Sequence, residues 1–73
     1  MKGDIHLLDV VALIEPIPER ALARGQVGTV VEVLASGVFE IEFSDDDGQA
    51  YAFASVPGDK LLVLHYKPVK AAS

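Results

Sequence analysis

The sequence contains no cysteine, and only six of its 73 residues are lysine or arginine. Without cysteine the chain cannot form a disulfide or a thiolate metal site, which fits a reducing cytoplasm. Eleven acidic residues give a formal net charge of −5. Nucleic-acid binding depends on lysine and arginine contacts to phosphates, so the composition argues against that partner. The same shortage argues against an anionic membrane surface.

Long hydrophobic runs are missing as well. The longest, at residues 10–14, is too short to span a bilayer. His6 and Asp9 interrupt the stretch where a secretory signal would need its apolar region, and no small-residue cleavage site follows. We therefore expect a cytoplasmic protein that does not enter a membrane.

Apolar residues are abundant, because 51% of the chain is hydrophobic. A domain of this length buries only about 60% of the surface that its unfolded chain exposes, so its core is thin. Apolar side chains that the core cannot hide remain on the surface. We interpret this excess as a sign of self-association or of a protein partner.

The most informative stretch is residues 24–33, where Gly25 and Gly28 lead into a run of β-branched residues. Glycine permits positive φ and close backbone approach, while valine and threonine favour a strand. The stretch predicts a bent entry into a twisted strand at about residues 26–34. Simple alternation places Val27, Thr29, Val31 and Val33 on one face, and Gln26, Gly28, Val30 and Glu32 on the other.

Four other segments have the length and pattern of strands: residues 9–14, 38–43, 49–54 and 61–66. The second has the cleanest alternation, with Phe39, Ile41 and Phe43 toward the core and glutamates toward water. In residues 49–54 aromatics alternate with alanines, and the pattern does not fix which face is buried. We favour the orientation that packs Tyr51 and Phe53 inside, because a thin core needs its aromatics.

Turn signals separate these strands. Residues 44–48 form an acidic turn, residues 35–37 a short hairpin connection, and residues 57–60 a break with a single 3₁₀ turn. The first connection is a long loop with room for one helical turn at residues 20–23. Five strands so connected predict an all-β fold, a small five-stranded SH3-like barrel. The alternative is an OB-fold, which usually carries a helix where this chain has only the acidic turn.

We expect a single SH3-like domain over residues 1–73, with its core at about residues 7–66 and a flexible tail at residues 67–73. Four segments are distinctive when they occur together: Leu-Leu-Asp-Val-Val-Ala-Leu at residues 7–13, Arg-Gly-Gln-Val-Gly-Thr-Val-Val-Glu-Val at 24–33, Glu-Ile-Glu-Phe-Ser-Asp at 40–45 and Leu-Leu-Val-Leu at 61–64. With them the chain resembles a family of short bacterial proteins that is classed as a domain of unknown function and is common in cyanobacteria. The resemblance implies an SH3-like barrel and supplies no catalytic residues.

Two further functions follow from resemblance. Genes of this family look like members of small paired gene units, which implies an antitoxin or an accessory subunit of a neighbouring gene product. Gly25, Gly28 and Val30 also match the Gly-x-x-Gly-x-Val pattern of KOW domains, which implies a nucleic-acid-associated module. RNA-binding KOW domains carry basic residues around this motif, whereas here Arg24 stands almost alone.

Candidate chemistry is sparse. The acidic turn fails the EF-hand test, since glutamine, alanine and Val56 occupy positions that a calcium loop needs for other residues. His6 and His65 lack a third ligand for zinc, and Glu40 and Glu42 fit a solvated outer face better than a catalytic pair. No serine lies in a nucleophile-elbow pattern. We therefore expect no enzymatic activity, no cofactor and no metal.

The long first loop is the best candidate for contact with a protein partner or with a second copy of the chain. In SH3 domains the corresponding loop borders a peptide groove lined by aromatics. Tyr51, Phe53 and Tyr66 are the aromatics that could form such a groove. The predicted partner-binding residues are Pro16, Ile17, Pro18, Arg20, Leu22, Arg24, Tyr51 and Tyr66.

Overall fold

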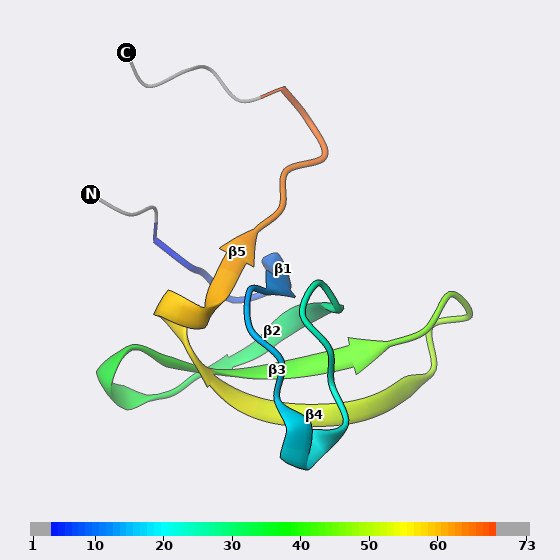
Figure 1. The fold of residues 1–73 in the computed structure, drawn as a ribbon. Coiled ribbons are helices and arrows are strands. Elements are labelled where there is room, and N and C mark those ends of the chain that lie inside the picture. Colours follow the sequence, from blue (N-terminus) through cyan, green and yellow to red (C-terminus); the bar gives the residue numbers. More distant parts are fainter. Residues whose placement is uncertain (1–3, 69–73) are drawn as a thin grey trace.

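The computed structural model describes residues 4–68. It contains one antiparallel sheet of five strands in the order β4-β3-β2-β1-β5. The strands are β1 (Val10–Leu13), β2 (Val27–Val33), β3 (Val38–Ser44), β4 (Ala50–Pro57) and β5 (Leu61–Val63). Figure 1 shows the first four following one another across the sheet, after which β5 returns to β1. The prediction of an all-β fold with five strands is confirmed.

Three short 3₁₀ helices complete the described residues: η1 (Pro18–Arg20), η2 (Ala35–Gly37) and η3 (Gly58–Lys60). The last confirms the 3₁₀ turn predicted there. The helical turn expected at residues 20–23 lies earlier, because Pro18 starts η1 and Ala21 ends it in the left-handed region at φ 56°. The final strand is also shorter than expected, and the tail residues 69–73 lie outside the described residues.

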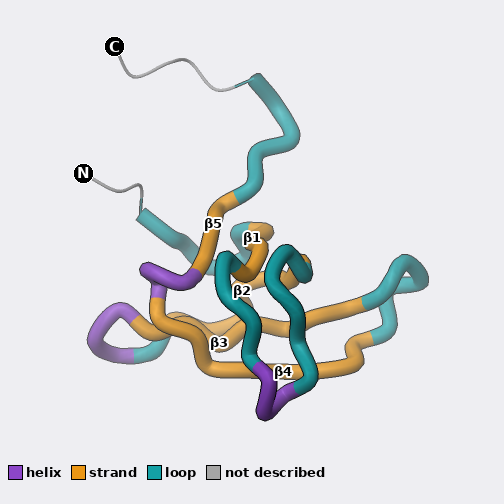
Figure 2. Tube along the Cα trace, viewed as in Figure 1, coloured by secondary structure: helices purple, strands orange, loops and turns teal. Residues whose placement is uncertain are grey.

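The sheet is bent as in small β-barrels, and β4 and β5 are its two edges (Figure 2). The loop after β1 lies across the sheet with η1 beside β4. Assignment of this sheet to the SH3-like barrels remains a prediction.

The core lies on the concave face and contains only apolar side chains among residues 4–68. Strand β3 supplies its largest members, since Phe39, Ile41 and Phe43 are all buried, as the alternation predicts. The remaining members come from the other four strands and from one loop position: Val11, Leu13, Leu22, Val30, Ala54, Val56 and Leu61.

The alternation of side chains along β2 is interrupted, so the prediction that it continues through Val33 is wrong. Val30 faces Ile41 across the ladder, but the pairing then shifts so that Glu32 lies opposite Glu40. The extra residue, Val31, is a β-bulge, and a bulge reverses the face that later residues occupy. Up to the bulge the alternation holds, since Val27 and Val31 are exposed and Val30 is buried; beyond it Val33 lies opposite Phe39.

The two glycines at the entry to β2 have the two predicted roles. Gly25 has a φ of +90°, which side chains rarely tolerate. A Cβ on Gly28 would lie 2.6 Å from Cγ2 of Ile41 and 2.8 Å from the carbonyl oxygen of Glu42. Strands β2 and β3 can therefore approach this closely only with glycine at position 28.

Strand β4 is oriented opposite to our expectation. Tyr51 and Phe53 are each 49% exposed, whereas Ala54 and Val56 are buried. The inward positions of β4 lie directly across from the large core residues of β3. Aromatic side chains at those positions would need the volume that β3 already fills, so β4 places its small residues inside.

Candidate functional site

The loop between β1 and β2 (residues 14–26, the β1–β2 loop) is a folded element. Ile17 and Leu22 form an isolated bridge, in which the Ile17 N–H donates to the Leu22 carbonyl at 2.8 Å and the reverse bond is 3.1 Å. Leu22 is only 3% exposed and belongs to the core. The loop is thus a small hairpin held down by one buried leucine.

Gln26 fixes the returning arm of this loop. Its Nε2 donates to the Tyr51 hydroxyl on β4 at 2.7 Å, and its Oε1 accepts from the Ala23 backbone N–H. The Gly25 N–H also donates to the Leu13 carbonyl at 2.7 Å. These bonds join the loop to both β1 and β4.

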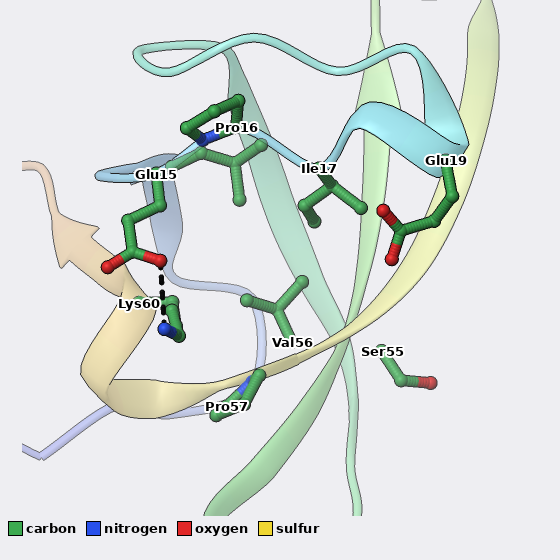
Figure 3. Close-up of a pocket in the computed structure, with 9 residues that line it drawn as sticks. Glu15, Pro16, Ile17, Glu19, Ser55, Val56, Pro57 and Lys60 are labelled. Carbon is green, nitrogen blue, oxygen red and sulfur yellow. Dashed lines mark hydrogen bonds and ion pairs between the residues drawn. The ribbon is translucent and has the colours of Figure 1, made fainter.

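A groove of about 200 Å³ lies between the β1–β2 loop and the end of β4, and we call it the β4 groove (Figure 3). Ile17 from the loop and Val56 from β4 extend into it and form an apolar floor. Its full lining is Leu13, Glu15, Pro16, Ile17, Glu19, Ser55, Val56, Pro57 and Lys60.

Charged side chains occupy two sides of the groove. On one side Lys60 Nζ donates to Glu15 Oε1 at 2.8 Å, and this hydrogen bond raises the pKa of Lys60, with charge attraction to Glu15 as the second cause. Glu19 lies on the opposite side (Figure 3) and makes no hydrogen bond or ion pair within residues 4–68. The groove therefore offers one unpaired carboxylate beside an apolar floor.

Ser55 does not supply a nucleophile to this groove. Its hydroxyl donates to Glu40 Oε1 at 2.7 Å, and Figure 3 shows the side chain pointing away from Ile17 and Val56. The groove is suited to holding an extended segment with an apolar side chain next to a cation.

The structure divides the six predicted partner-binding residues of the loop into three groups. Pro16 and Ile17 line the β4 groove, while Pro18, Arg20 and Arg24 are exposed on the loop outside its lining. Leu22 is buried, so its assignment to a contact surface is wrong; its side chain is needed to anchor the loop.

The predicted aromatic groove is not assembled. Tyr51 is exposed on β4 and bonded to Gln26, and Phe53 is exposed on the same strand. Tyr66 lies beyond β5 and lines a separate hollow with Leu64, His65, Lys67 and Pro68. The final strand ends before Tyr66, so the chain does not carry this ring to the β4 groove.

Sequence reasoning missed most of the groove lining. Ser55, Val56, Pro57 and Lys60 come from β4 and η3, and Glu19 from the loop was not singled out. The proline and glycine at residues 57–58 were a usable signal, since they mark where β4 ends. No residue pattern in the sequence indicates that the β1–β2 loop packs against the end of β4.

The other polar candidates have local roles. Asp9 accepts a bond from the His6 backbone N–H at 2.8 Å, and Asp45 Oδ1 accepts from the Asp47 and Gln49 N–H groups at 2.9 and 3.0 Å. Within residues 4–68, no three histidine, aspartate or glutamate side chains lie close enough together to hold a metal ion. Helices of the described chain are all too short to cross a membrane.

In comparison with known proteins, the model of a family described as a domain of unknown function, DUF4926, matches residues 7–63, which include all five strands. No curated protein and no solved structure gives a significant match.

Proposed function

The chain belongs to the DUF4926 family, and we propose that this member is a non-enzymatic protein-interaction module that also associates with itself. The β4 groove is the observation that carries the proposal. It combines the apolar floor of Ile17 and Val56 with the unpaired carboxylate of Glu19. Binding is by surface packing, with no bond made or broken.

The groove chemistry suits an extended segment of a partner protein. An apolar side chain of that segment packs against Ile17 and Val56, and a lysine or arginine next to it pairs with Glu19. Glu15 is already paired with Lys60, and within residues 4–68 Glu19 has no such partner, so Glu19 is the carboxylate that selects a cation.

Self-association is supported by the apolar side chains outside the groove. Ten large apolar side chains of the described residues are more than one third exposed: Leu7, Leu8, Ile14, Val27, Val31, Val33, Tyr51, Phe53, Leu62 and Tyr66. Large exposed apolar areas on a small soluble domain are typical of interaction surfaces. A cytoplasmic setting is part of the proposal, since the chain has no cysteine.

Partner binding is tested by placing a photoreactive amino acid at Pro16 in the cell of origin, because Pro16 is an exposed residue of the groove lining and its replacement leaves Glu19 in place. Asp46 of the exposed acidic turn is the control position. We expect a discrete crosslinked protein from position 16 and none from position 46. Equal crosslinking at both positions, or none at position 16, would contradict the groove as a binding site.

Self-association is tested by size-exclusion chromatography with light scattering over a micromolar to millimolar concentration series. A mass that rises with concentration supports the proposal, and a strict monomer at every concentration contradicts it.

The charge around the loop favours protein over nucleic acid, because Glu15 and Glu19 lie close to Arg20 along the chain. Filter binding at low salt separates the two functions, since even weak phosphate contacts are detected there. Retention of RNA or DNA on the filter would favour the KOW-like alternative.

A further inference from the structure

The two edges of the sheet differ greatly in length. The β5 edge has three residues and the β4 edge has eight. An edge strand exposes unpaired N–H and C=O groups that can pair with another chain, and short edges offer few of them. The β4 edge is therefore the one long enough to act as a template.

Two of the usual protections against pairing are missing from β4, namely a charged residue and a proline within the strand. No residue of Ala50–Pro57 is charged, and its one proline is the last residue. The single irregularity of its ladder lies at the start, between Phe43 and Ser44 of β3. Within residues 4–68, the backbone of residues 50–57 bonds to β3 and to no loop segment.

We propose that β4 pairs antiparallel with β4 of a second copy, about a two-fold axis beside Phe53, so that the two sheets become one. This inference rests on the proposed self-association and names its surface. A two-fold axis perpendicular to the sheet keeps each residue on its own face. Phe53 then lies opposite the partner's Phe53, and Tyr51 lies opposite the partner's Ser55.

A second copy is the occupant that the strand fits best. Directly opposed side chains in an antiparallel pair lie about 4.5–5.5 Å apart at Cβ, so the two Phe53 rings would be in contact. Both rings are half-exposed and available. The chain carries a net charge of −5, yet none of that charge lies within β4, so like charges along the strand do not oppose the pairing.

The test compares Phe53→Lys with Leu62→Lys by sedimentation equilibrium. Phe53→Lys places two lysines directly opposite each other across the axis. Within its own chain, position 53 lies opposite Glu42 on β3, so the new lysine gains a partner and the fold is retained. Leu62→Lys adds the same charge to an exposed position on the other edge strand.

We expect Phe53→Lys to raise the dimer dissociation constant about tenfold or more, and Leu62→Lys to change it little. Thermal unfolding of both variants checks that they fold. In the wild type, alternate amides of residues 50–57 should gain protection from hydrogen exchange as concentration rises, a result that needs no variant.

The outcomes separate this inference from the proposed function. Pairing through β4 is overturned if Leu62→Lys dissociates the dimer, Phe53→Lys does not, and β4 gains no protection from exchange as concentration rises. Self-association itself would still stand in that case. A wild type that is monomeric at every concentration overturns both pairing through β4 and self-association, while crosslinking from position 16 would still support partner binding.

Discussion

Strands β3 and β4 are neighbours of nearly equal length, and they distribute their side chains in opposite ways. β3 buries its large apolar residues and leaves its glutamates half-buried, whereas β4 buries Ala54 and Val56 and exposes Tyr51 and Phe53. On the concave face the pairs are large against small: Phe43 with Ala52, Ile41 with Ala54, and Phe39 with Val56. The large side chains of β3 thus fill most of the interior beneath this strand pair, and the aromatic side chains of β4 remain on the surface.

The largest effect should come from removing a large β3 residue. Phe43→Ala should lower the free energy of unfolding by about 3–5 kcal/mol, because the fully buried ring leaves a cavity. Phe53→Ala removes the same ring from the exposed face of β4 and should cost about 1 kcal/mol or less. Urea denaturation measures both, and equal losses would contradict the division between the strands.

The second prediction enlarges a small β4 residue. Ala54→Leu should cost about 1–3 kcal/mol, because Ala54 is 3% exposed and lies opposite Ile41. Combining it with Ile41→Ala should recover part of the loss, since the pair then keeps its total volume. Strict additivity of the two single changes in urea denaturation would show that the residues do not share space.

The third prediction concerns the outer face of β4. Tyr51→Phe removes the hydroxyl that accepts from Gln26 and should lower the unfolding free energy by about 0.5–1.5 kcal/mol. Amide exchange in residues 14–26 should become faster, because the loop loses its bond to β4. Tyr66→Phe is the matched control, since Tyr66 is 84% exposed, and it should change neither quantity.

The smallest effect belongs to the ion pair beyond the end of β4. Glu15 raises the pKa of Lys60 above 10.5 in the folded chain, so the pair stabilises the fold at neutral pH. That contribution disappears as the pH rises through the folded pKa, where Lys60 loses its proton. Wild type and Lys60→Gln should therefore differ slightly at neutral pH and converge at alkaline pH in thermal unfolding.

Glu15→Gln provides the control for this pair. It should show the same convergence with pH and return the pKa of Lys60 toward 10.5 in an NMR titration. Because both side chains are exposed, added salt should weaken the difference as well. A gap between wild type and either variant that persists at high pH would point to packing by the Lys60 stem instead.

The contrast between the two strands also explains what the sequence could predict. β3 was predictable because Glu40 and Glu42 alternate with apolar residues, so only one face can be buried. β4 has apolar side chains at nearly every position, and its pattern is compatible with either face inside. The large residues of β3 already fill the space opposite the inward positions of β4, and this decides which face of β4 is buried. Which residues lie opposite each other depends on strand pairing and is not visible in the β4 sequence.

Two other features were also missed because they depend on contacts between segments that are distant in the sequence. The bulge at Val31 depends on how β2 matches β3, and a run of valines looks the same with or without it. Leu22 was predicted to belong to the contact surface of the loop, yet the hairpin turns its side chain into the core. The loop that forms one wall of the groove was predictable from Pro16 and Pro18, whereas the opposite wall depends on tertiary packing.

The buried Leu22 has a consequence for binding. A loop anchored in the core, closed by the Ile17–Leu22 bridge and tied to Tyr51 is already ordered before any ligand arrives. Ordering a flexible loop on binding costs conformational entropy, and a pre-organised one avoids most of that cost. A single leucine that never touches a ligand could thus determine how tightly this small domain holds one.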